Sequence, residues 1–323
     1  MKKFANYSVA IRTLGKSGEL FEGLITSLKA QSIPPAQIFV YIAEGYAFPP
    51  RVADETYIRV PKGMVHQRAL PYDEITSSYI LFCDDDVFFA PDSVEKLFTA
   101  LQERQAHCVA PNVFPNHAWS LKSKLIGAVM YGTFPSWCSR YAFRIRSSSY
   151  YSYRMHPAPV MKTQSFGGPC FLISKEAFLA AHFEQECWLD GFPYATGEDQ
   201  MLAYKLYLTG KNVIVHYNSG VEHRDARTAH VDSMQTRDYN NRVIRYIIWY
   251  RTIYQCRQTI IGKGSAIVAF YAFWSWLFLL DVLSWARRKG KYKPRAAVVS
   301  LCEAKNFVES ESFRSLPVWE KKK

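Results

Sequence analysis

Short runs of β-branched and aromatic residues alternate with segments of helical periodicity over residues 7–217, and this alternation most restricts the possible folds. Strand-like segments at 7–13 and 38–42 are separated by an apolar helical face and by the pair Pro34-Pro35, which ends the helix. Alternating strands and helices favour a parallel sheet with helices packed on it. The sequence therefore predicts an α/β domain whose Rossmann-like, mostly parallel central sheet is flanked by helices.

Charge divides the chain into two unequal parts. Residues 1–236 contain 23 basic and 22 acidic residues, whereas residues 237–323 contain 17 and 6. A nearly neutral body joined to a strongly basic tail indicates a globular domain and a region that meets an anionic partner. We expect residues 1–235 to form the globular domain and residues 236–323 to form a basic, amphipathic helical region that associates with a membrane surface.

The tail contains an apolar run at 266–280 that only Ser275 interrupts. Because a spanning helix needs about 20 apolar residues, the run favours a re-entrant or in-plane membrane helix, with a buried core helix as the alternative. The basic cluster at 286–295 suits anionic lipid headgroups. An apolar run next to basic residues favours lipid over bases, so we expect no nucleic-acid partner.

The cysteines and the N-terminal residues indicate in which cellular compartment the protein is expected. Seven cysteines occur without CxxC or Cys/His ligand spacing, which favours a reducing compartment and no structural zinc. The apolar stretch before Arg12 is too short for a secretory signal. We expect the protein on the cytoplasmic face of the inner or plasma membrane.

The regular pattern breaks down between residues 121 and 165. Residues 121–164 carry seven basic side chains and no acidic ones, together with many tyrosines and serines. A long irregular segment in a compact domain is usually functional. We therefore expect a basic insertion near an acceptor site.

A hydrophobic strand at 79–83 runs into three adjacent carboxylates, Asp84, Asp85 and Asp86. Ligands of open α/β sheets bind at the carboxyl ends of the strands. Strand alternation predicts Asp84 and Asp86 on one side and Asp85 on the other. Like charges on one side favour a hard divalent cation, which in turn can hold a diphosphate. A solvated acidic turn is the alternative for these aspartates taken alone.

A second acidic pair, Glu198 and Asp199, follows a loop with glycine and proline and opens a helix. The helix dipole favours an ionised carboxylate there, and one of the two acids is a candidate general base toward an acceptor hydroxyl. Simple capping of the helix is the alternative. His223, which follows the last strand, is a candidate metal or phosphate contact, with a structural role as its alternative.

Together and in this order, the motifs resemble the family 2 glycosyltransferases of the GT-A fold. The resemblance covers about residues 7–227 and rests on the opening strand 8–13, the segment GMVHQR at 63–68, the Asp84-x-Asp86 element, the segment FGGPCF at 166–171, the Gly197-Glu198-Asp199 element and His223. Two departures from the family pattern touch the expected nucleotide pocket. Arg12 stands where the family usually has proline, and Ala43-Glu44-Gly45 replaces its paired aspartates.

The resemblance implies inverting transfer of a sugar from a nucleotide diphosphate donor, a UDP-sugar before others, with Mn²⁺ or Mg²⁺ as the cofactor. It implies nucleotide contacts at Thr13, Glu44, Arg68, Asp84 and Asp85, metal contacts at Asp86 and His223, contacts with the donor sugar or acceptor at Gly167, Gly168 and Glu198, and a base at Asp199. The basic insertion and the basic tail favour a glycan or lipid-linked acceptor in the synthesis of surface polysaccharide or glycolipid.

Two other functions are compatible with parts of the sequence. A sugar nucleotidyltransferase would need a glycine-rich, lysine-bearing loop after the first strand; the segment LGKSG at 14–18 is short, and Glu198-Asp199 would be unexplained. A non-catalytic nucleotide-sugar-binding scaffold of a polysaccharide assembly complex would fit the altered pocket residues but not the retained acids. Release of pyrophosphate rather than a nucleoside diphosphate distinguishes the nucleotidyltransferase.

Overall fold

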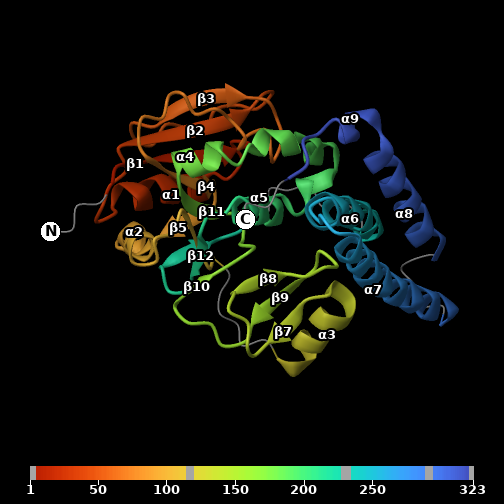
Figure 1. Cartoon of the computed structure of the whole chain (residues 1–323). Helices are drawn as coiled ribbons and strands as arrows, with labels where there is room; N and C mark the ends of the chain where they lie inside the picture. Colours follow the sequence, from red (N-terminus) through yellow and green to blue (C-terminus); the bar gives the residue numbers. More distant parts are fainter. Residues whose placement is uncertain (1–4, 114–119, 227–233, 288–293, 320–323) are drawn as a thin grey trace.

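The computed structural model describes residues 5–113, 120–226, 234–287 and 294–319, and a twisted sheet lies at its centre (Figure 1). Eight strands form this sheet in the order β10-β12-β6-β11-β4-β1-β2-β3. Their bounds are β1 Tyr7–Thr13, β2 Gln37–Ala43, β3 Thr56–Val60, β4 Tyr79–Asp84, β6 Cys108–Pro111, β10 Val160–Lys162, β11 Cys170–Ser174 and β12 Val213–His216. Strands β3, β2, β1 and β4 pair in parallel, as do β6 and β12, whereas β10 and β11 run antiparallel to their neighbours. The predicted α/β class with a mostly parallel sheet is confirmed.

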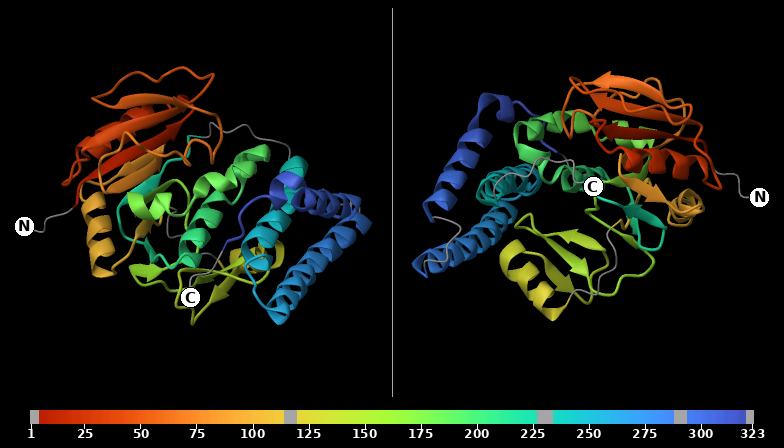
Figure 2. Two further views of the ribbon diagram at one scale, coloured as in Figure 1. Left: turned by 45° about the horizontal axis from the view of Figure 1, so that its top comes forward. Right: turned by 180° about the vertical axis from the view of Figure 1, so that it is seen from behind.

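Strand alternation builds a hydrophobic core on each face of the sheet. Val9 and Ile11 of β1 face the helices α1 (Glu19–Lys29) and α2 (Ser93–Glu103). Ala10 of β1 and Phe82 of β4 face α4 (Lys175–Leu179) and α5 (Glu198–Leu208) on the other side. The two views of Figure 2 show the helices on both faces of the sheet. Since every second residue points to the same face, one strand contributes to both cores.

Two short strands extend the fold at the carboxyl end of β4. After Asp84 the chain turns and enters β5 (Val87–Phe89), which pairs antiparallel with β13 (Val221–His223). The register sets His223 opposite Val87. This pairing brings His223 next to the aspartates although well over a hundred residues separate them in the sequence.

The segment 121–165 is more regular than the sequence predicts. It contains α3 (Leu121–Tyr131), followed by a small sheet of β7 (Phe134–Ser136), β8 (Phe143–Ile145) and β9 (Tyr151–Arg154), and then β10. The prediction of an irregular segment was wrong because the strands are three or four residues long, too short for a detectable alternation. In α3 the apolar residues do not lie along one buried stripe, since Leu121, Leu125 and Ile126 are all exposed.

The C-terminal residues form a helical layer with its own core. Helix α6 (Met234–Trp249) continues into a π-helical turn at Tyr250–Tyr254, and α7 (Ile260–Ala286), α8 (Pro294–Glu309) and α9 (Glu311–Arg314) follow. Residues Val243, Trp249, Phe270, Ala304 and Phe313 pack together between these helices. Most of the predicted basic cluster at 286–295 lies outside the described residues.

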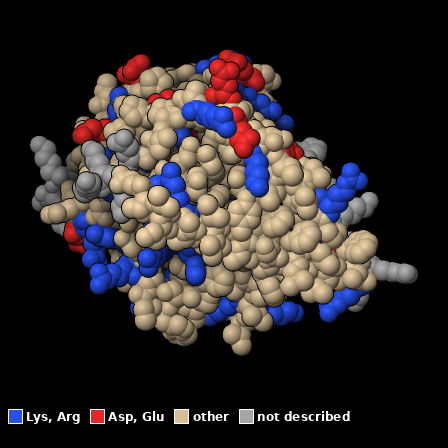
Figure 3. Space-filling view, turned by 45° about the vertical axis from the view of Figure 1, so that its right-hand side comes forward, with Lys and Arg blue, Asp and Glu red and all other residues tan. Residues whose placement is uncertain are grey.

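Helix α7 is the one helix in the described part of the chain that is long and apolar enough to cross a membrane. Only 17% of its most apolar 18-residue window is buried inside the structure. The buried residues of α7 are Ala266, Phe270 and Asp281. The alternative prediction of a buried core helix therefore does not hold for α7. Figure 3 shows a broad face with few charged side chains, and Lys and Arg gather around its edge.

A buried group of charges fastens the helical layer to the α/β domain. Glu186, in the 3₁₀ segment Phe183–Gly191, accepts hydrogen bonds from Arg251 Nη2 at 3.0 Å, Lys205 Nζ at 3.1 Å and Trp319 Nε1 at 2.9 Å. The side chains of Glu186 and Arg251 are fully buried. Burial alone would raise the pKa of Glu186, but Arg251 and Lys205 more than offset it and hold the pKa below its usual range. These contacts cross the predicted division at 235/236, which stays a prediction.

Candidate active site

The carboxyl ends of β1 and β4 border an open cavity of about 610 Å³, which we call the sheet-edge cavity. Thr13, Asp84, Asp85 and Asp86 line it. The 3₁₀ turn Pro193–Ala195 and the loop before it close the opposite side. Strand β4 ends at Asp84, so the predicted alternation does not extend through Asp85 and Asp86, and the three carboxylates have three different sets of partners.

Asp86 and His223 form a pair at the junction of β5 and β13. Asp86 Oδ1 lies 3.1 Å from His223 Nε2, is buried, and makes no hydrogen bond of regular geometry. Asp86 Oδ2 accepts a hydrogen bond from the backbone N–H of Ala226 at 2.8 Å. The close approach to Asp86 raises the pKa of His223, although burial opposes this. A carboxylate oxygen and an imidazole nitrogen at this separation fit a shared divalent cation.

Asp84 belongs to a buried network of two arginines and two acids. Arg12 forms a bidentate contact with Asp84, from Nε to Oδ1 at 2.5 Å and from Nη2 to Oδ2 at 3.1 Å. Its Nη1 also donates to Glu198 Oε1 at 3.0 Å. Arg68 donates to both oxygens of Glu198, at 2.7 and 2.9 Å, and to the carbonyl of Gly168 at 2.8 Å. Since the two positive charges balance the two negative ones, the network is neutral and joins the end of β4 to the start of α5.

The other predicted nucleotide contacts are distributed unevenly. The hydroxyl of Thr13 donates a hydrogen bond to Asp85, and burial raises the pKa of Asp85. Both residues line the sheet-edge cavity. Neither Arg68 nor Glu44 lines that cavity. Arg68 is 1% exposed and its guanidinium group binds Glu198, whereas Glu44 is exposed on the surface outside the cavity. The roles assigned to these residues stay predictions.

Asp199 lies at the first turn of α5 and is held by backbone groups. Gln200 N–H donates to Oδ1 at 2.7 Å, and Gly168 N–H donates to Oδ2 at 3.1 Å. Burial, followed by the charge of Glu198, raises the pKa of Asp199 to about 6, although these two N–H groups and Arg68 oppose the shift. A side chain at position 168 would place its Cβ 3.1 Å from the Cβ of Asp199. Glycine therefore allows this close approach.

The sequence did not indicate Asp190, which lines the sheet-edge cavity. Its carboxylate accepts hydrogen bonds from the backbone N–H groups of Val65 at 3.0 Å and His66 at 2.8 Å, and it contacts His66 Nδ1 at 2.6 Å. A Cβ at Gly63 would collide with this carboxylate. Asp190 thus fixes the turn that leads to Arg68. In the sequence, the only indication of a role for Asp190 was its position in the Gly- and Pro-containing loop before Glu198.

Comparison with known proteins finds a family match for part of the chain. Residues 40–178 match the family described as "Glycosyl transferase family 2". No curated protein matches at a significant level. A solved structure of GalNAc-T7 with UDP, GalNAc and Mn²⁺ is similar to this chain, with 12% sequence identity and a TM-score of 0.48, over 83% of this chain and 55% of that one. This chain thus spans about half the length of that solved chain.

The family match includes Arg68, the three adjacent aspartates and Gly167-Gly168, but it ends before Asp199 and His223. Of the two strands whose carboxyl ends border the sheet-edge cavity, the match includes β4 but not β1. The resemblance predicted from the motifs is confirmed over residues 40–178, which match the model of glycosyltransferase family 2.

Proposed function

We propose that the chain is a metal-dependent, inverting glycosyltransferase that moves a sugar from a nucleotide diphosphate donor to a hydroxyl group of a glycan or lipid-linked acceptor. The observation that carries the proposal is Asp199, whose pKa is raised to about 6 and whose two oxygens are oriented by backbone N–H groups. Such a carboxylate is ionised at neutral pH and is a better proton acceptor than an ordinary aspartate.

The proposed reaction is a single displacement. The acceptor oxygen forms a bond to the anomeric carbon of the donor sugar, its proton goes to Asp199, and the bond between the sugar and the nucleoside diphosphate breaks. Gly168 and Gln200 position Asp199 for this transfer through their hydrogen bonds. Glu198 cannot serve equally well because Arg12 and Arg68 both occupy its carboxylate.

We propose that Asp86 and His223 hold Mn²⁺ or Mg²⁺. The support is the buried Oδ1 of Asp86, which faces His223 without a regular hydrogen bond. A bound divalent cation supplies positive charge that offsets the charge developing on the departing diphosphate. Among the residues the structure describes, no group of three or more acidic, His or Cys side chains could hold a metal ion, so Asp86 and His223 would be the two side chains that hold it.

We also propose that α7 and the uncharged face beside it contact a membrane, on the cytoplasmic side. The support is the low burial of α7 and the number of large apolar side chains that it exposes. Ile260 and Ile261, at the start of the helix, are 91% and 86% exposed. Exposed apolar area of this extent, bordered by basic residues, is typical of membrane-contacting surfaces.

Thermal unfolding of the full chain with UDP, GDP or dTDP, each with and without Mn²⁺ or Mg²⁺, tests donor and metal binding. A ligand that binds the native state raises its stability by mass action. We expect stabilisation by UDP that requires the metal and is lost in Asp86→Asn. Asp92→Asn, which changes an exposed carboxylate at the start of α2, is the matched control and should respond like the wild type.

Turnover tests the proposed chemistry. We expect release of a nucleoside diphosphate from the donor sugar and a loss of at least about a hundredfold in Asp199→Asn, the usual effect of removing a general base. Release of pyrophosphate would instead identify a nucleotidyltransferase. Tight nucleotide binding with no release of nucleoside diphosphate would contradict the proposal in favour of a binding scaffold.

A further inference from the structure

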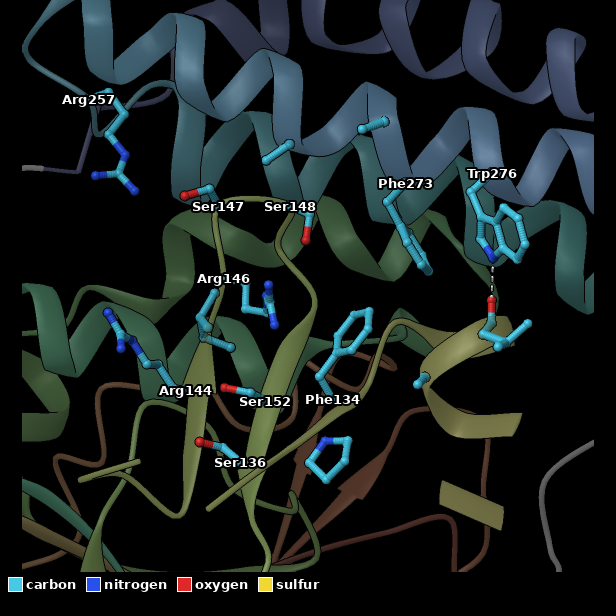
Figure 4. A pocket seen from close by; sticks show the side chains of 16 residues that line it. Phe134, Ser136, Arg144, Arg146, Ser147, Ser148, Ser152, Arg257, Phe273 and Trp276 are labelled. Atoms are coloured by element: carbon cyan, nitrogen blue, oxygen red, sulfur yellow. Dashed lines mark hydrogen bonds between the residues drawn. The ribbon is translucent and has the colours of Figure 1, made fainter. Parts of the chain in front are cut away.

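A second cavity, of about 1000 Å³, lies between the segment 121–165 and helix α7 (Figure 4). We call it the α3/α7 cavity. It shares no lining residue with the sheet-edge cavity. Its walls come from two regions that are far apart in the sequence, and a hydrogen bond from Trp276 Nε1 of α7 to the carbonyl of Val129 in α3, 3.1 Å long, holds them together.

One end of this cavity is strongly positive. Arg144, Arg146 and Arg257 line it, and no acidic residue does. Within the described ranges, none of the three guanidinium groups has a carboxylate partner. Arg146 lies over the ring of Phe134 at 4.7 Å, which leaves its hydrogen-bond donors available. Three unpaired guanidinium groups favour a phosphate, which accepts paired hydrogen bonds from arginine.

The other end of the cavity is apolar and aromatic. Figure 4 shows Phe273 and Trp276 on the side away from the arginines, and Phe134, whose ring lies under Arg146, between the two ends. The ring of Phe273 contacts that of Tyr150, with 4.4 Å between centroids, which extends the aromatic surface at this end. A molecule that fills both ends needs a phosphate at one end and a hydrocarbon chain at the other.

The helices α3 and α7, which contribute to the walls of the cavity, also expose apolar side chains to the outside. On α3, Leu121 and Leu125 are 84% and 64% exposed, and on α7, Val268 is 69% exposed. This is the same surface that we propose to contact the membrane. A hydrocarbon chain longer than the cavity can therefore leave it along α3 and α7 and remain in an apolar environment.

The cavity is also connected to Asp199. Ser147 and Ser148 line it, and the next residue, Ser149, accepts a hydrogen bond from Gln200 Nε2 at 3.0 Å. The backbone N–H of Gln200 in turn donates to Asp199 Oδ1. Arg245 Nη1 donates to the same Ser149 carbonyl at 3.3 Å. The loop that closes the cavity is thus fixed to the start of the helix that carries Asp199.

We propose that the α3/α7 cavity binds a phosphate-bearing lipid, with the phosphate held by Arg144, Arg146 and Arg257 and the chain along Phe134, Phe273 and Trp276. This inference rests on the proposed function, because the lipid is the carrier of the acceptor. The segment 121–165 and α7 then form a single binding site, and the basic character of the insertion serves recognition of the phosphate.

Binding of dodecyl phosphate to the full chain tests the inference, with inorganic phosphate and dodecanol as the two partial ligands. We expect dodecyl phosphate to bind at least about tenfold more tightly than either one, since each lacks one of the two sets of contacts. Arg144→Gln combined with Arg257→Gln should weaken its binding about tenfold or more. Arg140→Gln, an exposed charge of the same segment outside the cavity, should leave binding unchanged. Ala272→Trp, which adds volume at the apolar end, should weaken dodecyl phosphate but not inorganic phosphate.

The outcomes separate this inference from the proposed function. Equal affinity for inorganic phosphate and dodecyl phosphate would show a free-phosphate site and overturn the lipid. Unchanged affinity in the double arginine variant would overturn the site. If UDP and metal stabilise the protein while dodecyl phosphate does not bind, the inference fails and the transferase proposal stands. If dodecyl phosphate binds through the arginines while no nucleotide binds, the lipid site stands but its link to sugar transfer is refuted.

Discussion

The raised pKa of Asp199 predicts that this residue lowers the stability of the protein at neutral pH. Its pKa rises from 3.8 to about 6 because burial and the charge of Glu198 disfavour its ionised form. A shift of this size corresponds to about 3 kcal/mol of unfavourable free energy when the group is ionised in the folded protein. Below the unfolded pKa both states hold the proton, so the cost vanishes there. The cost grows as pH rises and is complete above the folded pKa of about 6.

The variant Asp199→Asn isolates this cost. Relative to the wild type, its free energy of unfolding should increase by about 2 kcal/mol between pH 4.5 and pH 7 and then stay constant. The substituted amide has one acceptor oxygen fewer for the N–H groups of Gly168 and Gln200, but that loss does not depend on pH. Urea denaturation of both proteins across this pH range measures the difference. Turnover in the wild type should fall on acidification with a midpoint near 6, and the variant should be inactive.

Two results would refute this reasoning. A stability difference that does not change with pH would show that Asp199 is ionised as easily in the folded as in the unfolded chain. Near-normal turnover in Asp199→Asn would show that the group is not the base. Asp92→Asn is the control, because Asp92 is exposed and its pKa is lowered by Lys96, so its difference should not grow with rising pH.

Three further predictions concern Glu186, at the junction with the helical layer, and Gly168 and Asp190, at the candidate active site. Glu186→Gln should lower the free energy of unfolding by about 3–5 kcal/mol, because it leaves Arg251 and Lys205 buried without their anion. Denaturation of the full chain measures this change. As the control, Glu184→Gln at an exposed position should change the free energy of unfolding by less than about 0.5 kcal/mol. Gly168→Ala should reduce kcat at least about tenfold with a stability loss of about 1–3 kcal/mol, since its Cβ displaces Asp199; unchanged steady-state kinetics would argue against the close contact. Asp190→Asn should raise the KM for the donor more than it lowers kcat, because it loosens the turn at Val65 and His66 beside the cavity, and comparison of the two constants decides this.

The strands of the central sheet could be predicted from the sequence because their signal is local. Strand β1 has the expected bounds, and β4 begins at the expected residue and extends one residue further, to Asp84, because most residues of each strand are apolar. The small sheet β7-β9-β8 could not be predicted in this way. Its strands have three or four residues, too few to show a pattern of their own, and the sheet is defined by their pairing with one another.

Which residues lie at the candidate site was easier to predict than which side chains they contact. The type and spacing of Asp86, His223 and Asp199 indicated metal and base chemistry, and the pairing of β5 with β13 places His223 against Asp86. The contact between Arg68 and Glu198 spans 130 residues, and only the packing of α5 against the sheet decides it. No spacing rule contains that information.

The two neighbouring acids Glu198 and Asp199 have different surroundings, and this difference supports the roles that we propose for them. Glu198 receives both Arg12 and Arg68, so its charge is balanced inside the network and its oxygens are occupied. Asp199 is held by the backbone N–H groups of Gly168 and Gln200, and burial, followed by the neighbouring charge of Glu198, raises its pKa. When two adjacent acids differ in this way, one is fixed as a structural anion and the other is free to exchange a proton. Arg12, which stands where the family usually has proline, strengthens this division because it adds a second cation to Glu198 and not to Asp199. The departure from the family pattern therefore supports the assignment of Asp199 as the base.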